Sequence, residues 1–213
     1  MPLVSAAATG SPSRIVTAQH WFDFLCPFCY LAQDRNRILA ERGVHVVGRG
    51  LQIHPEIGPG GSPAGPRSGP TYEYLAHEAE AAGLPLRWTD RMPYSRPALS
   101  AFEWLRTTDP EAAERFATAV FAAYFADGQD IEPVDRLAAL ARGAGADADG
   151  LRAALASGAA EAALAGSEDL AGEYGVAGTP AWVAGGQRAF GLRPREWFED
   201  WAGTLTRRVV VET

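Results

Sequence analysis

Two cysteines three positions apart are the residues of this chain best suited to chemistry. Cys26 and Cys29 are the only cysteines among 213 residues, and Pro27 and Phe28 lie between them. A disulfide between such close neighbours closes a very small loop, so it adds little stability to a fold. In a chain with no other cysteine, this spacing is more typical of redox or metal chemistry than of a structural crosslink.

A metal site is the weaker of these two interpretations. A structural zinc site takes four ligands, usually two such cysteine pairs or one pair with two closely spaced histidines. The four histidines, His20, His45, His54 and His77, are scattered along the sequence. A c-type haem would need a histidine directly after the second cysteine, where this chain has Tyr30. We therefore expect no metal and no haem.

The segments around the cysteines predict a βαβ unit. Residues 15–25 are rich in β-branched and aromatic side chains, residues 30–42 have helical spacing, and residues 44–53 resemble a second strand. This order places Cys26 at a helix N-terminus, where unpaired N–H groups and the helix dipole favour the thiolate. Cys29 lies one turn further on. We expect Cys26 to attack and Cys29 to resolve.

The remaining segments predict a second half of the same domain after a helical insertion. Residues 54–70 contain five glycines and five prolines, which excludes a regular element. Residues 71–174 have helical signals throughout, whereas residues 181–190 predict a hairpin with a Gly185-Gly186 turn, followed by a helix from Pro194.

The resulting order, β-α-β, helices, then β-β-α, predicts an α/β fold with a discontinuous domain. We assign residues 13–60 and 171–211 to a thioredoxin-like domain and residues 71–170 to an inserted α-helical domain.

Two motifs resemble one family. Residues 22–32 (FDFLCPFCYLA) and residues 175–180 (GVAGTP) resemble the DsbA-like family of the thioredoxin superfamily, and its FrnE-type branch in particular. The resemblance implies a thioredoxin-like fold and a cis peptide bond before Pro180, close to the cysteines. It also implies that Pro27, Phe28, Thr179 and Pro180 contact the substrate, with the Thr179 hydroxyl within reach of a cysteine sulfur.

Two further residues, His20 and Asp23, lie shortly before the cysteines in the sequence. We expect them to support the site. His20 stands six residues before Cys26, where thioredoxins have a buried acid, so the carboxylate proton relay of those relatives is missing. We interpret His20 as a core or supporting histidine rather than a catalytic base. Asp23 matches the branch and is either an anchor for the loop or a proton carrier. Many relatives of the branch have tryptophan where this chain has Phe28.

Charge and composition exclude several other classes. The formal net charge is −7, which disfavours binding to nucleic acid or to an anionic membrane. All the cationic side chains of Lys/Arg type are arginines, so Schiff-base and phosphate-loop lysines are excluded. Residues 1–14 do not resemble a secretory signal, and no apolar run reaches about 18 residues, so we expect a cytoplasmic protein.

We therefore predict a DsbA/FrnE-type thiol–disulfide oxidoreductase. It needs no bound cofactor, acts on a disulfide-containing protein or a small thiol-linked substrate, and exists as a monomer or homodimer. A low-molecular-weight thiol such as glutathione or mycothiol, or a partner reductase, would restore the dithiol.

Two alternatives stay open at this point. One is a thiol-dependent transferase, isomerase or reductase of small aromatic or polyketide-like molecules. Residues 23–32 are similar to 2-hydroxychromene-2-carboxylate isomerases and kappa-class glutathione transferases, although those relatives have serine at the position of Cys26. The other is a binding or chaperone-like module without turnover.

Overall fold

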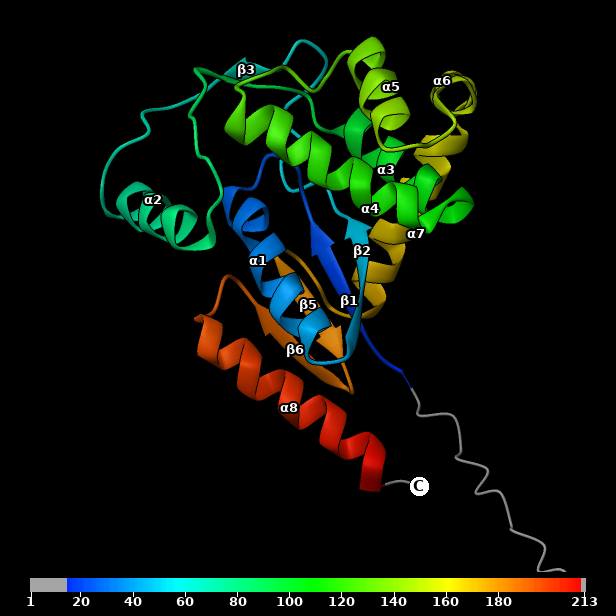
Figure 1. Ribbon diagram of the computed structural model, residues 1–213. Helices are drawn as coiled ribbons and strands as arrows, with labels where there is room; N and C mark the ends of the chain where they lie inside the picture. The colour runs from blue at the N-terminus through cyan, green and yellow to red at the C-terminus, as the bar shows by residue number, and fades with distance from the viewer. Residues whose placement is uncertain (1–14, 212–213) are drawn as a thin grey trace, which may run out of the picture.

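A four-stranded mixed sheet forms the centre of the molecule in a computed structural model that describes residues 15–211. Its strand order is β2-β1-β5-β6, with β1 and β2 parallel and the other neighbours antiparallel. The elements of this part are β1 (Val16–Phe22), α1 (Pro27–Glu41), β2 (Val44–Gly50), β5 (Ala181–Ala184), β6 (Gln187–Phe190) and α8 (Arg195–Val211). The predicted β-α-β and β-β-α halves are confirmed, and Figure 1 shows them joined in one sheet.

The strands and helices of this sheet begin and end close to the predicted positions. Strand β1 ends at Phe22, three residues before the predicted end, because Asp23, Phe24 and Leu25 form the turn that leads to Cys26. Helix α1 begins earlier than predicted, at Pro27, whose missing N–H costs nothing at a first helical position.

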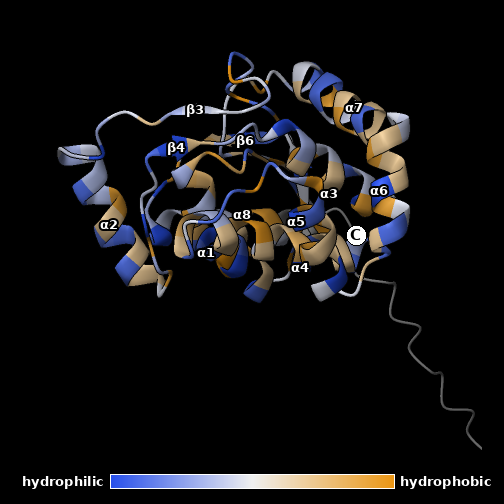
Figure 2. Cartoon of the chain, turned by 90° about the horizontal axis from the view of Figure 1, so that it is seen from above, coloured by the Kyte–Doolittle hydropathy of each residue, from blue (hydrophilic) through white to orange (hydrophobic). Residues whose placement is uncertain are grey.

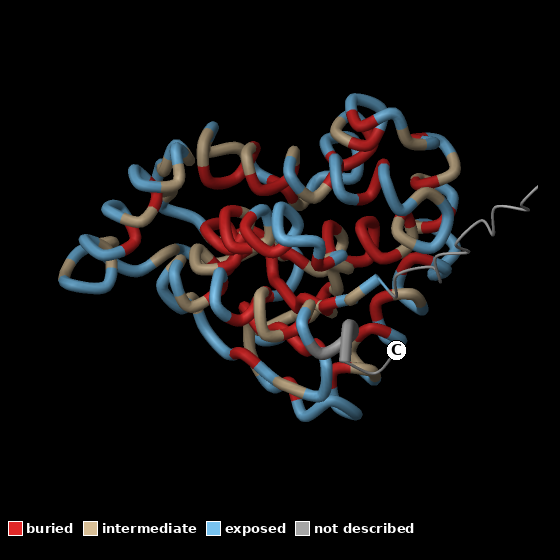
Figure 3. Tube along the Cα trace, turned by 60° about the horizontal axis from the view of Figure 1, so that its bottom comes forward, coloured by how far each residue is buried: buried red, intermediate tan, exposed pale blue. Residues whose placement is uncertain are grey.

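Alternation along β1 distributes side chains to the two faces of the sheet. On one face, Ala18 joins a buried cluster with Trp182 and with Phe198 of α8, and α1 covers the same side. On the other face, Trp21 packs with Val183 and with side chains of the helix that precedes β5. The buried segments gather in the middle of the molecule, and exposed loops and helix ends surround them (Figure 3).

The middle of the chain forms a helical block beside the sheet, as predicted. Its elements are β3 (Ser62–Pro63), α2 (Pro70–Ala82), β4 (Arg91–Met92), α3 (Arg96–Thr108), α4 (Pro110–Phe121), a π-helical turn η1 (Ala122–Ala126), α5 (Val134–Gly143), α6 (Ala148–Ser157) and α7 (Ala159–Glu173). Apolar and polar residues separate onto different faces of these helices (Figure 2).

The expectation of helix throughout residues 71–174 is wrong between α2 and α3. Residues 84–95 contain no helix, because Pro85 and Pro93 interrupt it. They contain β4, which pairs with β3 from the glycine- and proline-rich loop. That loop, predicted to be without regular structure, therefore contributes two residues to a small ribbon.

Buried hydrogen bonds fix the helical block to the sheet. The backbone N–H of Gly50, at the end of β2, donates to Glu103 of α3 over 2.6 Å. The Ser167 hydroxyl of α7 donates to the Gly50 carbonyl over 2.8 Å, and Trp21 donates its indole N–H to the Ser167 carbonyl over 3.3 Å. Helices α3 and α7 are thus held at the carboxyl ends of β1 and β2. The domain boundaries at residues 13–60, 71–170 and 171–211 stay predictions, and residues 13 and 14, with the rest of the N-terminal segment 1–14, lie outside the described residues.

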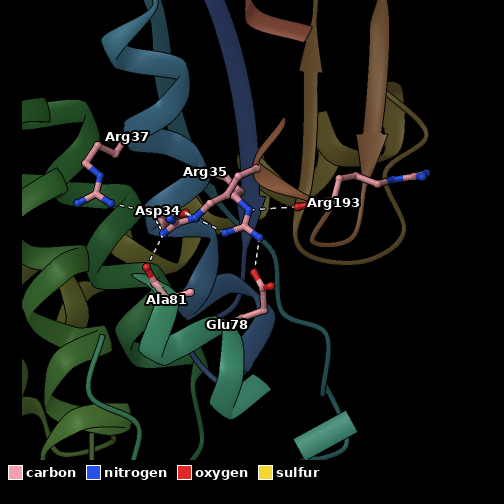
Figure 4. A network of polar contacts seen from close by, with 7 residues as sticks. Asp34, Arg35, Arg37, Glu78, Ala81 and Arg193 are labelled. Carbon is pink, nitrogen blue, oxygen red and sulfur yellow. Dashed lines mark hydrogen bonds and ion pairs between the residues drawn. The ribbon is translucent and has the colours of Figure 1, made fainter. Parts of the chain in front are cut away.

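A buried ion cluster joins α1 to α2 and α8. Asp34 is 4% exposed and accepts from Arg35, Arg37 and Arg195 over 2.6 to 2.9 Å. Arg35 also pairs with Glu78 of α2. Figure 4 shows this cluster where the three helices meet. The buried carboxylate and the buried guanidinium of this cluster each have hydrogen-bonded partners of opposite charge. Such pairing is required for charged groups in a low-dielectric interior.

Candidate active site

The two cysteines occupy the first turn of α1 as free thiols. Cys26 is the N-cap residue, with an extended backbone at φ −81° and ψ 112°, and Pro27 follows at the start of the helix. The backbone carbonyl of Cys26 accepts from the N–H groups of Cys29 and Tyr30 over 3.0 and 3.1 Å. Cys26 is 5% exposed and Cys29 only 1%. The first cysteine therefore lies nearer to the surface than the second.

The loop before β5 meets Cys26 through a cis peptide bond. The bond between Thr179 and Pro180 is cis, as the resemblance implied. The Cys26 Sγ lies 3.6 Å from the backbone carbonyl oxygen of Thr179. The direct contact is therefore made by the backbone carbonyl of Thr179.

The Thr179 hydroxyl contributes less directly than the resemblance implied. It is buried and has no hydrogen-bond partner of regular geometry among the described residues. Thr179 nevertheless lowers the pKa of both thiols, so its side chain lies near the sulfurs as expected. The residue thus acts on the cysteine pair through its backbone carbonyl, which contacts Cys26, and through its side chain, which lowers the pKa of both thiols.

The environment separates the two thiols electrostatically. Hydrogen bonding from Cys29 lowers the pKa of Cys26, while burial acts in the opposite direction. Burial raises the pKa of Cys29 well above the usual value for a thiol, and the neighbouring Cys26 adds to this effect. Of the two thiols, Cys26 is therefore the one that ionises first, and it is the better nucleophile.

Asp23 anchors the loop in front of the cysteines. It is fully buried, and its two carboxyl oxygens accept from the backbone N–H groups of Leu25 (3.0 Å) and Ile53 (2.8 Å). Burial raises the pKa of Asp23 despite these hydrogen bonds, and its charge raises the pKa of Cys26. Of the two roles predicted for Asp23, the geometry favours the anchor.

His20 belongs to the core behind the cysteines. Its ring stacks on Trp182 with centroids 4.5 Å apart, and its Nδ1 lies 3.0 Å from the side-chain nitrogen of Asn36. Burial lowers the pKa of His20 to about 3, so the ring is neutral near pH 7. Trp182 is fully buried and donates its indole N–H to the side-chain oxygen of Asn36 over 2.8 Å.

Of the predicted substrate-contacting residues, Pro27 and Phe28 are half-buried beside Cys26, Thr179 is half-buried, and Pro180 is buried. Phe28 packs against the hydrophobic cluster of the helical block. The structure thus brings the Cys26 turn and the Thr179-Pro180 bend together.

Asn36 is a supporting residue that the sequence did not reveal. It contacts both His20 and Trp182 from the inner side of α1. The available signal was its position seven residues after Cys29, which places both residues on the same side of the helix.

The DSBA-like thioredoxin domain matches residues 17–201, which is most of the chain. The chain belongs to this family. No curated protein matches it in sequence. Its assignment to the FrnE-type branch stays a prediction.

Several solved structures share the DsbA-like fold. A "probable DsbA oxidoreductase" from Streptomyces coelicolor is 25% identical, with a TM-score of 0.74 and 89% of each chain covered. A 2-hydroxychromene-2-carboxylate isomerase is 24% identical, with a TM-score of 0.73 over 92% of this chain and 99% of that one. The cytosolic disulfide reductase DsbM from Pseudomonas aeruginosa, solved with glutathione, is 21% identical, with a TM-score of 0.62 over 91% and 98%.

We searched the part of the chain that the structure describes for a metal-binding cluster and for a membrane-spanning helix. Among residues 15–211, no three His, Cys, Asp or Glu side chains are grouped so that they could hold a metal ion. Within the same range, no helix has the length and apolar character needed to cross a membrane.

Proposed function

We propose that this DsbA-like protein is a thiol–disulfide oxidoreductase in which Cys26 attacks and Cys29 resolves. The observation that carries the proposal is the 3.6 Å approach of the Cys26 Sγ, at the start of α1, to the Thr179 carbonyl. This approach puts a thiol of lowered pKa beside the backbone of the Thr179-Pro180 bend, where a bound chain or small thiol can be aligned.

The proposed reaction has two exchange steps. The Cys26 thiolate attacks one sulfur of a substrate disulfide, a mixed disulfide forms, and the other substrate sulfur leaves as a thiolate. Cys29 then loses its proton and attacks the Cys26 sulfur, which forms the Cys26–Cys29 disulfide and releases the second substrate thiolate. Two electrons pass from the protein to the substrate, and the reverse sequence oxidises a dithiol substrate.

The raised pKa of Cys29 suits the second step of this sequence. A buried, protonated Cys29 leaves Cys26 as the reactive sulfur until the mixed disulfide has formed. Once Cys26 is bound in that disulfide, its negative charge is gone and no longer opposes ionisation of Cys29. The two thiols therefore act in order rather than in competition.

The proposal also includes the substrates and the reductant of the protein. Substrates are protein disulfides or small thiol-linked molecules, and a low-molecular-weight thiol such as glutathione or mycothiol, or a partner reductase, restores the dithiol. DsbM, which shares this fold, is a cytosolic reductase solved with glutathione, and this supports both the co-substrate and a cytoplasmic location here. The protein would need no bound cofactor and would work as a monomer or homodimer.

Mass spectrometry after mixing reduced protein with oxidised glutathione tests the proposal. The wild type should become an internal disulfide, and Cys29→Ser should accumulate a glutathione adduct at Cys26. Cys26→Ser should stay unmodified under the same conditions, because the remaining thiol is buried and protonated. Equal modification of both single variants would refute the assigned roles.

A second assay separates the remaining candidates. Reduction of insulin disulfides in the presence of glutathione should require both cysteines. Conversion of a small substrate without net oxidation or reduction, retained in Cys29→Ser, would instead favour the transferase or isomerase chemistry of the isomerase that shares the fold. A wild type with neither activity would leave the binding module without turnover.

A further inference from the structure

Arg67, in the glycine- and proline-rich loop before α2, is a half-buried cation held by aromatic rings. Its guanidinium carbon lies 5.3 Å from the ring centroid of Trp88 and 5.9 Å from that of Tyr72. These two rings meet edge to face, with their centroids 5.1 Å apart. Stacking on two rings restricts the orientation of the planar guanidinium. The side chain is thus held in place by contacts that leave its charge unneutralised.

The positive charge of Arg67 has no counter-ion in the part of the chain that the structure describes. Nη1 donates to the Tyr72 hydroxyl over 3.3 Å, and none of the ion pairs among residues 15–211 includes Arg67. Nη2 makes no hydrogen bond or ion pair with the described residues and, unlike Nε, is not fully buried. By contrast, Arg35 and Arg96, which join elements of the fold, each pair with two carboxylates. Arg67 therefore has N–H groups available for an anion from outside the chain.

The aromatic contacts under Arg67 continue to the helix of the cysteines. The Trp88 ring meets Phe125 at 6.2 Å, and Phe125 stacks at 4.9 Å on Tyr30, which belongs to the first turn of α1. The Tyr30 hydroxyl also donates to the carbonyl of Pro85 over 2.6 Å. The segment that carries Trp88 therefore lies against the beginning of α1, and Figure 1 shows α2, which follows the Arg67 loop, beside the same helix.

A half-buried apolar surface connects the cysteine turn with Arg67. Phe28, between the two cysteines, and the two rings under Arg67 are partly buried and pack against the same hydrophobic cluster. Tyr124 of that cluster is close to both ends of this surface. Burial raises the pKa of Tyr124, and of the charges around it Arg67 lowers this pKa while Asp23, the anchor of the cysteine loop, raises it. A molecule held at the cysteines can therefore extend over apolar side chains towards a free guanidinium.

We propose that Arg67 binds a carboxylate of the substrate whose disulfide Cys26 attacks. This inference rests on the exchange reaction proposed above and specifies its substrate class, a small or peptide disulfide with a carboxylate several bonds away from the sulfur. A carboxylate matches the site because its two oxygens accept from the planar N–H groups of a guanidinium. A substrate with an amine at the same position is disfavoured, because the fold leaves the Arg67 charge unopposed.

The rates at which two disulfides oxidise the reduced full-length protein test this inference, with acid quenching and mass spectrometry as the readout. Oxidised glutathione has carboxylates, whereas bis(2-hydroxyethyl) disulfide is uncharged. Arg67→Gln should slow the reaction with oxidised glutathione about tenfold more than the reaction with the uncharged disulfide, as expected for one lost hydrogen bond between charged groups. Arg136→Gln is the matched control, because Arg136 is exposed on α5 and donates to the amide of Gln129. It should leave the ratio of the two rates unchanged.

The salt dependence of the wild type tests the same contact without a substitution. Raising NaCl from about 50 mM to about 500 mM should reduce the preference for oxidised glutathione, because salt screens an ion pair that is partly open to solvent. The net charge of −7 alone predicts the opposite trend, since salt would screen the repulsion of an anionic substrate. A preference that rises with salt would overturn the inference.

The uncharged disulfide separates failure of this inference from failure of the proposed function. A wild type that reacts with neither disulfide refutes the exchange reaction, and the inference with it. If the wild type reacts with the uncharged disulfide but Arg67→Gln changes both rates by the same factor, the inference alone is overturned. The same conclusion follows if Arg136→Gln changes the ratio of the rates as much as Arg67→Gln does.

Discussion

Replacing His20 by phenylalanine is expected to reduce the loss of stability in weakly acidic solution. Burial lowers the pKa of His20 to about 3, whereas a histidine of an unfolded chain titrates near about 6.5. Between these values the unfolded chain binds one more proton than the folded protein, so the stability contribution rises with pH. The contribution is fully present above about pH 6.5 and is lost progressively as the pH falls towards about 3.

The magnitude follows from linkage for a single group. With these two pKa values, the free energy of unfolding falls by about 2 kcal/mol between pH 7 and pH 5 because of His20 alone. Phenylalanine keeps the stacking on Trp182 but leaves the Asn36 amide without its acceptor, at a cost of about 1–3 kcal/mol. That cost does not depend on pH. The slope of the free energy of unfolding against pH therefore reports the protonation of His20 alone.

Urea denaturation under reducing conditions, followed by tryptophan fluorescence at several pH values, measures this slope. His77→Phe is the matched control, because His77 is exposed on α2 and water solvates it in both states. The control should follow the wild type, and the stability of the wild type relative to His20→Phe should fall by about 2 kcal/mol from pH 7 to pH 5. Parallel curves for wild type and His20→Phe would refute the reasoning.

Three further experiments probe the groups of α1 and the loop before it. Cys26 should react with iodoacetamide at a pH below the usual thiol pKa of about 8.5, and a midpoint at or above that value would contradict its activation. Asp23→Asn removes a charge that raises the pKa of Cys26 and should shift that midpoint to lower pH; an upward shift would count against the electrostatic explanation. Asp34→Ala should destabilise the protein by about 1–3 kcal/mol in urea, because buried Arg35 loses one of its two carboxylate partners and keeps Glu78 alone. Asp135→Ala, which removes an exposed ion pair, is its control and should change stability little.

The local signals around the cysteines were sufficient to predict the halves of the sheet. Strand β1 and helix α1 are close in sequence, and their hydrophobic periods and Pro27 at the junction mark the boundary between them. The hairpin of β5 and β6 is equally local, because Gly185 and Gly186 adopt the positive φ values that its turn needs. These features depend on neighbours along the chain, which a sequence displays directly.

The features that the sequence did not predict depend on distant partners. The ribbon of β3 and β4 joins residues about thirty positions apart, and no pattern in a glycine- and proline-rich loop specifies such a pairing. Asn36 contacts Trp182 and His20 only once α1, β5 and β1 are packed together, so the sequence around Asn36 does not reveal these contacts.

The contacts of Asn36 also have a mechanical consequence. Asn36 belongs to the helix that begins directly after Cys26, and Trp182 to the strand that begins directly after Pro180. The two sides of the exchange face are therefore connected to each other through the interior, and their spacing is a property of the core rather than of the loops. The Trp182–Asn36 hydrogen bond opposes any separation of the Cys26 turn from the Thr179-Pro180 bend. For the disulfide exchange proposed above, this connection predicts that the substrate rather than the protein changes shape when it is presented to Cys26.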